Sequence, residues 1–201
     1  MSYKTIIFDL GNVLIDFSHE KMFEQVGATA GIPSHAVYEL LFEERAGFQY
    51  ERGLISTDEI ASLIQKRATL SFEMIDLIEA ASAIFTPKEE MELLVQKLKK
   101  KGYRLLILSN TFEPHIDYIS KNYTILPYFD AHIYSFEVGY AKPEPKIYHE
   151  ALKVAQCAPS ECFYIDDKIE NIRPAEILGI QCHHFRTPSL LMDDLIRTGI
   201  L

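Results

Sequence analysis

Residues able to do chemistry lie after the apolar runs of this chain, either directly or in the following loop. The set comprises three acids, one lysine, one hydroxyl and one amide. They are Asp9, Asp166, Asp167, Lys142, Ser109 and Asn110. Ligands of open α/β sheets bind at the carboxyl ends of the strands. If the apolar runs are parallel strands, these side chains should converge on one edge of a sheet.

Three carboxylates at one edge would repel one another unless a cation lay among them. Mg²⁺ fits such a site, because it binds through one or two carboxylates together with water and substrate phosphate. Lys142 would add a fixed positive charge, and Ser109 could donate to phosphate oxygens. Asp9 could then act as a metal ligand or as a nucleophile that forms an aspartyl phosphate.

Five short runs read as the strands that position these residues. They are mostly continuous in apolar residues, which is typical of a parallel sheet covered on both faces. The runs are Thr5–Phe8, Arg104–Leu108, Ala131–Ser135, Cys162–Ile165 and Ile180–Phe185. Helical patterns alternate with them at Pro87–Lys101, Glu144–Ala155 and Ile169–Leu178. The sequence therefore predicts a Rossmann-like, doubly wound, mostly parallel five-stranded sheet.

One long stretch breaks this alternation. Between Ser18 and Phe85 only helical patterns occur, and that is too long for one crossover connection. The expected helices are Lys21–Ala30, Ser34–Ala46, Thr57–Ala68 and Phe72–Ala83, with a loop at Phe48–Gly53. We therefore expect an α/β core of residues 1–17 and 86–201 and an inserted helical cap of residues 18–85.

Composition narrows the classes of partner. The 201 residues carry a formal net charge of −9, which disfavours nucleic acid and anionic membranes as partners. Apolar runs are shorter than the roughly 20 residues of a membrane-spanning helix. Three cysteines without pairing or metal spacing indicate a reducing, cytoplasmic location. A small phosphorylated metabolite is the expected partner, and the oligomeric state stays open.

Four ordered motifs resemble those of the haloacid dehalogenase superfamily. They are FDLGNV at the first strand, LSN after the second, GYAKP after the third and FYIDDKIEN after the fourth. The inserted helices resemble the C1-type cap of that superfamily. The first motif is similar to that of bacterial sugar-phosphate phosphatases with DLGNV, including the alpha-D-glucose-1-phosphate phosphatase branch.

The resemblance implies a role for each matched residue. Asp9 would be nucleophile and metal ligand, Gly11 would bind metal through a carbonyl that its flexible backbone turns inward, and Lys142 would neutralise charge. Asp167 would ligate Mg²⁺ directly, and Asp166 directly or through water. Ser109 and Asn110 would hold phosphate, and Asn171 would orient Asp167. From the cap, Arg45 and Arg52 could contact the substrate or could simply be solvated.

Gly11 also departs from the superfamily's usual pattern, in which a second Asp acts there as acid and base. The proton source could have moved to Asp16, His19, Glu43 or Glu44. The main hypothesis is a Mg²⁺-dependent phosphatase acting on a sugar phosphate. A phosphate-binding or regulatory module with little turnover is one alternative. A 2-haloacid dehalogenase is another, although it needs no Mg²⁺ and the Asp166–Asp167 pair argues against it.

Overall fold

Five parallel strands form the centre of the chain. The computed structural model describes residues 3–201, and its sheet has the order β5-β4-β1-β6-β7. The strands are β1 (Thr5–Phe8), β4 (Arg104–Ser109), β5 (Ala131–Tyr134), β6 (Cys162–Asp166) and β7 (Gln181–His184). Central β1 pairs Ile7 with Leu106 on one side and with Tyr164 on the other. The predicted five-stranded sheet is confirmed, and the connections run outward from β1 in both directions.

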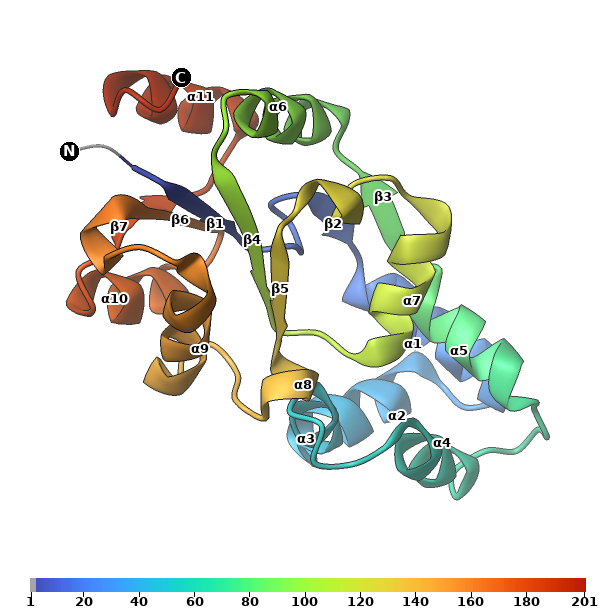
Figure 1. The fold of residues 1–201 in the computed structure, drawn as a ribbon. Helices are drawn as coiled ribbons and strands as arrows, with labels where there is room; N and C mark the ends of the chain where they lie inside the picture. The colour runs from blue at the N-terminus through green and yellow to red at the C-terminus, as the bar shows by residue number, and fades with distance from the viewer. Residues whose placement is uncertain (1–2) are drawn as a thin grey trace.

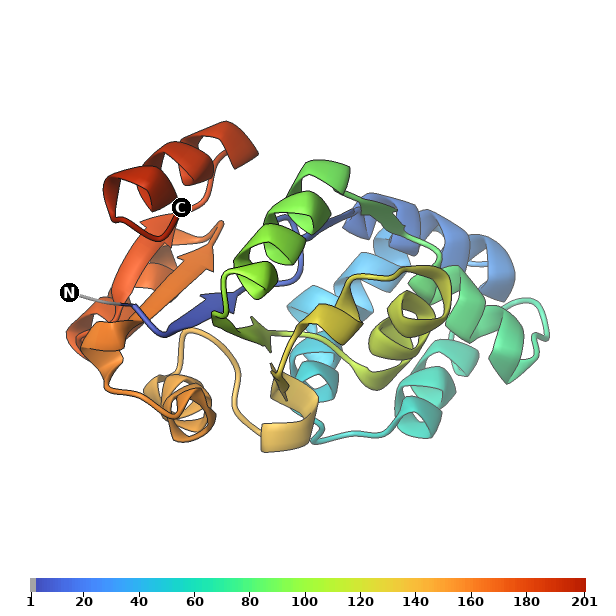
Figure 2. The same ribbon diagram turned by 45° about the horizontal axis from the view of Figure 1, so that its top comes forward.

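Helices cover both faces of the sheet (Figures 1 and 2). On one face, α6 (Glu89–Lys100) and α11 (Pro188–Arg197) pack on β1, β4 and β6. On the other, α9 (Pro145–Ala155) and α10 (Ile169–Ile177) cover the alternate residues of the same strands. This two-sided burial explains why the strands are apolar throughout. Two helices, α7 (Glu113–Asn122) and α11, were not predicted.

The segment between β1 and β4 is largely helical and has its own apolar core. It contains α1 (His19–Ala30), α2 (Ser34–Tyr38), the π-helical η1 (Glu39–Glu43), α3 (Ala46–Glu51), α4 (Thr57–Gln65) and α5 (Met74–Ser82). A small antiparallel ribbon of β2 (Ile15–Phe17) and β3 (Phe85–Pro87) brackets these helices. Short elements complete the chain: α8 (Ser135–Val138) and 3₁₀ turns at Leu126–Tyr128 and Pro159–Glu161. The division into core and cap stays a prediction.

Three local predictions were wrong. Phe85–Pro87 was expected to lead into a helix starting at Pro87, but it pairs with Ile15–Phe17 as a strand, and α6 starts at Glu89. The predicted helix Ser34–Ala46 breaks at Arg45, whose φ of 62° is left-handed. A new helix, α3, then replaces most of the loop expected at Phe48–Gly53. These breaks depend on contacts with distant segments, which local patterns do not report.

The described part of the chain, residues 3–201, contains no helix that is both long and apolar enough to cross a membrane.

Candidate active site

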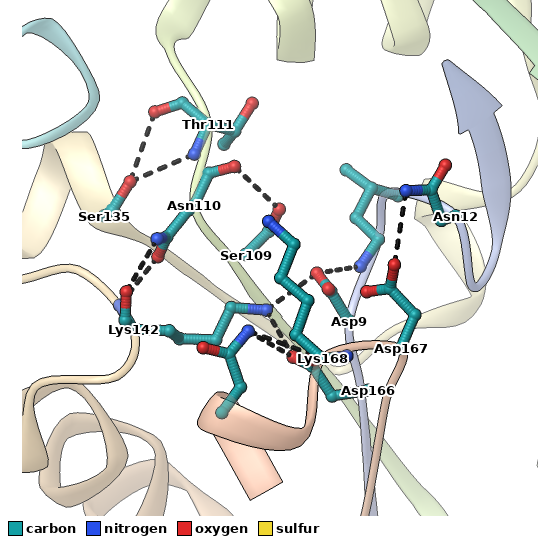
Figure 3. A network of polar contacts seen from close by, with 12 residues as sticks. Asp9, Asn12, Ser109, Asn110, Thr111, Ser135, Lys142, Asp166, Asp167 and Lys168 are labelled. Atoms are coloured by element: carbon teal, nitrogen blue, oxygen red, sulfur yellow. Dashed lines mark hydrogen bonds and ion pairs between the residues drawn. The ribbon is translucent and has the colours of Figure 1, made fainter. Parts of the chain in front are cut away.

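A buried lysine joins two buried carboxylates at the carboxyl end of the sheet (Figure 3). Lys142 Nζ lies 2.8 Å from Asp9 Oδ1 and 2.8 Å from Asp166 Oδ2. Asp9 directly follows β1, and Asp166 ends the neighbouring β6. Lys142 comes from the loop between α8 and α9. The predicted convergence of these three side chains is therefore seen in the structure.

The electrostatics of this triad follow from burial and repulsion. Burial, with Asp166 and Asp167 nearby, raises the pKa of Asp9 to about 7, although Lys142 opposes the shift. Burial also opposes ionisation of Asp166, but Lys142 outweighs it and holds the pKa of Asp166 below its ordinary value. Burial alone would lower the pKa of Lys142, whereas the two carboxylates raise it. The site is thus short of positive charge, and a bound cation would favour ionised Asp9.

Asp166 is saturated with hydrogen-bond donors. Its Oδ2 accepts from Lys142 Nζ and from the Tyr164 hydroxyl, and its Oδ1 accepts from the backbone N–H of Lys168 at 2.8 Å. Asn171 Nδ2 donates to both oxygens at 3.0 and 3.1 Å. The prediction that Asn171 orients Asp167 was therefore wrong, because its amide contacts Asp166. An Asp166 engaged in this way fits metal contact through water better than direct ligation.

Asp167 is more open and completes an acidic cluster. One oxygen from each of Asp9, Asp166 and Asp167 lies within 4.8 Å of the others. Asp167 Oδ2 accepts a hydrogen bond from Asn12 Nδ2 at 3.2 Å. A hard divalent cation such as Mg²⁺ fits three converging carboxylates, since it would relieve their repulsion.

The loop after β1 takes its shape from Asn12 rather than from Gly11. Asn12 has a left-handed φ of 57°, whereas Gly11 does not adopt a positive φ, so the expectation that glycine flexibility turns this backbone was wrong. Gly11 instead permits close packing. A Cβ at position 11 would lie 2.6 Å from Cε1 of Phe17. Any larger residue there, including the usual Asp, would require the Phe17 ring to move.

Asn110 holds the lysine loop in place. Its Nδ2 donates to the Lys142 carbonyl at 3.0 Å, and its Oδ1 accepts from the Lys142 N–H at 2.8 Å. The Asn110 side chain is thus occupied by backbone groups, which disagrees with its expected use on phosphate. Ser109 is buried at the end of β4 and lines the pocket, as a phosphate donor would. Next to them, Ser135 Oγ exchanges hydrogen bonds with the Thr111 backbone and fixes the end of β4 (Figure 3).

Asp9, Ser109, Lys142 and Asp167 line one pocket of about 200 Å³ between the sheet edge and the inserted helices. Two charged lining residues were not predicted, Lys168 and Glu51. Lys168 could have been noticed, because it directly follows the Asp166–Asp167 pair. Glu51 was not singled out as a site residue, although its segment, Phe48–Gly53, resembles the cap segment that faces the active site in C1-capped relatives.

The two cap arginines lie outside this pocket. Arg45 is exposed and its guanidinium lies 4.8 Å from the Phe48 ring centroid. Arg52 contacts the core instead: Nε and Nη2 donate to the Gly139 carbonyl at 3.3 and 3.2 Å, and Nη1 lies 3.1 Å from Glu144 Oε1. The structure therefore does not bring either arginine to the acidic cluster.

Of the four residues considered as the relocated proton source, only His19 lines the pocket. Burial lowers the pKa of His19, and Lys168 adds to the effect. This favours the neutral imidazole over the protonated form that a general acid needs. Asp16 pairs with Lys88 at 2.8 Å, and Glu44 pairs with Arg67 at 2.6 Å. Glu43 is exposed on η1.

Comparison with known proteins identifies the family. Residues 3–179 match the haloacid dehalogenase-like hydrolase family. The chain is 25% identical over 186 residues to the D-ribitol-5-phosphate phosphatase of Bacteroides thetaiotaomicron, covering 89% of each chain. It is 28% identical over 187 residues to the glyceraldehyde 3-phosphate phosphatase of Methanothermobacter thermautotrophicus, covering 88% of this chain and 80% of the relative.

A solved structure shares the fold over nearly the whole chain. A haloacid dehalogenase family enzyme of Bacteroides thetaiotaomicron, in complex with magnesium and inorganic phosphate, superposes with a TM-score of 0.82. Its sequence is 26% identical, and the match covers 92% of this chain and 95% of the other. The expected superfamily, hydrolase class and fold are therefore confirmed, and the named relatives are phosphatases. The chain belongs to the haloacid dehalogenase-like hydrolase family.

Proposed function

We propose that this protein is a Mg²⁺-dependent phosphatase that hydrolyses a small phosphomonoester, a sugar phosphate, through an aspartyl phosphate on Asp9. The observation that carries the proposal is the geometry at Asp9. This carboxylate directly follows the central strand, lies 2.8 Å from the buried Lys142 ammonium, and belongs to a cluster of three acids. Catalysis of phosphoryl transfer depends mainly on positioning and charge neutralisation, which such a site supplies.

The metal would be held by this chain's own oxygen atoms. Asp9 and Asp167 would ligate it directly together with the Gly11 carbonyl, and Asp166 would contact it through water. When bound, Mg²⁺ neutralises phosphate charge and favours the ionised form of Asp9. The magnesium and phosphate bound by the structural relative support this choice of ion.

The chemistry of the residues follows in two steps. An Asp9 carboxylate oxygen attacks phosphorus, forming a new P–O bond while the bond to the leaving oxygen breaks, and that oxygen takes up a proton. Water then attacks the phosphorus of the aspartyl phosphate, which releases inorganic phosphate and regenerates the Asp9 carboxylate. Ser109 and Lys142 would hold the phosphoryl oxygens during both steps. Asn110 would act through Lys142, whose backbone it positions.

The substrate class rests on the pocket and on the relatives. A cavity of about 200 Å³ suits a small metabolite, and the relatives' names specify phosphates of a pentitol and a triose. We also propose that residues 18–85 act as a cap that shields the site from water. The C1 type of this cap, likeness to the alpha-D-glucose-1-phosphate phosphatase group, a cytoplasmic location and the absence of nucleic-acid and membrane partners stay predictions.

The test is phosphate release by purified protein. The panel is p-nitrophenyl phosphate, ribitol 5-phosphate, glyceraldehyde 3-phosphate and glucose 1-phosphate, each with Mg²⁺ or with chelator. Wild-type protein and the matched control Asp58→Asn, an exposed helix position, should release phosphate only with Mg²⁺. Asp9→Asn should release none. The ranking of the panel would then identify the sugar.

Two results would redirect the assignment. A folded protein that binds phosphate and Mg²⁺ but releases nothing from any ester would favour the phosphate-binding module. Chloride release from 2-chloropropionate without Mg²⁺ would favour the dehalogenase, in which Asp9 attacks carbon.

A further inference from the structure

The leaving oxygen of an alkyl phosphate needs a proton, and the residue that usually supplies it is absent. Position 11 is Gly, and the Phe17 ring occupies the space where a Cβ would stand. An unprotonated alkoxide is a poor leaving group, and a positioned acid typically contributes 10²–10⁴-fold. Another acid at the pocket of Asp9 would therefore have to supply the proton.

Glu51 is the one acid on the pocket wall, among the described residues, that comes from the inserted helices. The other acids of the wall, Asp9 and Asp167, come from the sheet edge. Glu51 is the last residue of α3, is half-buried, and also lines an adjoining aromatic cavity with Phe42, Phe48 and Phe112. It thus lies between the phosphoryl site and the space beside it, where a leaving group would extend.

Both sequence neighbours of Glu51 are docked on the sheet domain. The Tyr50 ring stacks on Phe112 with centroids 4.7 Å apart, and Phe112 follows β4. On the other side, Arg52 holds the Gly139 carbonyl and Glu144 in the loop after α8. Two attachments to different loops fix the end of α3 against the sheet edge, so Glu51 is held over the pocket.

At Gly53, the residue after Arg52, the backbone comes still closer to α8. Gly53 has a left-handed φ of 64°, and a Cβ there would lie 2.3 Å from the Phe136 carbonyl oxygen of α8. Figure 1 shows α3 lying directly against α8. Only glycine permits this contact. The contacts of the Arg52–Gly53 turn thus fix the position of Glu51.

The surroundings of Glu51 suit a proton donor. Burial raises the pKa of its carboxyl, while Lys168 and Lys142 oppose the shift. A raised pKa favours the protonated carboxyl, which is the form that a general acid requires. The charged and titratable groups on the walls of the two cavities that Glu51 lines are Asp9, His19, Arg45, His115, Lys142, Asp167 and Lys168.

We propose that Glu51 is the general acid that protonates the leaving oxygen, a role that rests on the phosphatase function proposed above. As the P–O bond breaks, the Glu51 O–H proton moves to the departing oxygen and the alcohol leaves neutral. The resulting Glu51 carboxylate can take the proton back from the water that attacks the aspartyl phosphate. Atoms and charge then balance over one turnover, and no further reactant is needed.

The experiment compares two leaving groups in Glu51→Gln. p-Nitrophenolate leaves without a proton, whereas the alkoxide of ribitol 5-phosphate requires one. We expect kcat/KM for the alkyl phosphate to fall by about 10²–10⁴-fold. For p-nitrophenyl phosphate it should stay within about threefold of the wild type, because kcat/KM covers only steps up to loss of the leaving group. Glu39→Gln, at an exposed glutamate of η1 in the same inserted segment, is the matched control and should change neither value.

A second variant keeps the test independent of small structural changes. Glu51→Ala should lose alkyl phosphatase activity in the same selective way and recover part of it in acetic acid–acetate buffer at mildly acidic pH, where acetic acid can donate the proton. Equal losses for both substrates, or no loss for the alkyl phosphate, would overturn the role of Glu51. A wild-type protein inactive on both substrates with Mg²⁺ would instead refute the phosphatase function, and this role with it.

Discussion

His115 should make the stability of this protein fall as the pH is lowered from 7 to 5. The side chain is buried on α7, where Nε2 donates to the Ala81 carbonyl at 3.1 Å, so Nε2 carries a proton. The Phe112 and Phe85 rings lie beside it, with centroids 4.2 and 5.1 Å away. An imidazolium in this apolar contact between α7 and α5 would lose hydration without gaining a carboxylate partner.

The magnitude follows from the pKa values of the two states. Burial lowers the pKa of folded His115 from 6.5 to about 3, with smaller opposing and assisting effects from Ala81 and His19. Below pH 6.5 the unfolded chain binds a proton that the folded protein does not, so the free energy of unfolding decreases as pH falls. Between pH 7 and pH 5 the loss from this one group is about 2 kcal/mol.

Urea unfolding at the two pH values measures this loss. His115→Gln is the reference, because its amide can still donate to the Ala81 carbonyl but does not titrate. The wild type should lose about 2 kcal/mol more than His115→Gln between pH 7 and pH 5, since all other titrating groups cancel in the difference. Equal losses in the two proteins would refute the argument that His115 is kept neutral by burial.

Two further substitutions test the packing of the site. Lys142→Met leaves the two carboxylates that it bridges unpaired, so it should lower the free energy of unfolding at pH 7.5 by about 3–5 kcal/mol. Both proteins are compared by their melting temperatures, which fall with the free energy of unfolding. Lys146→Met, at an exposed lysine, is the control and should shift the melting temperature little. An unchanged melting temperature in Lys142→Met would contradict the ion-pair geometry. Gly11→Ala should cost about 1–3 kcal/mol in chemical denaturation, because the new Cβ meets the Phe17 ring. Adding Phe17→Leu should restore part of that loss, and a Gly11→Ala protein as stable as the wild type would show that the ring moves freely.

The sheet could be predicted from the sequence because each central strand is buried on both faces and so reads as a continuous apolar run. The residues after those runs could also be predicted, since parallel strands deliver their carboxyl ends to one edge. Asp9, Lys142 and Asp166 come together for this reason. The prediction was less accurate at the edge strand β7. This strand covers only Gln181–His184 of the expected Ile180–Phe185.

The partners of polar side chains could not be predicted in the same way. Asn110 and Asn171 carry donors and acceptors that would serve phosphate or metal equally well. Which of them contacts the Lys142 backbone and which contacts Asp166 depends on the spacing of loops from three different strands. Likewise, Arg52 looked like a substrate residue until its contacts with Gly139 and Glu144 were visible.

Which chemical residues follow which strand could be predicted from the sequence, because a strand buried on both faces is a local apolar run. What faces that sheet edge from the inserted helices depends on tertiary packing. Helix α3 follows the left-handed Arg45 and precedes Gly53, whose close approach to Phe136 has no local signature in the sequence. Long-range packing of this kind depends on shape and on the positions of distant backbones, and it alone brings Glu51 to the pocket of Asp9.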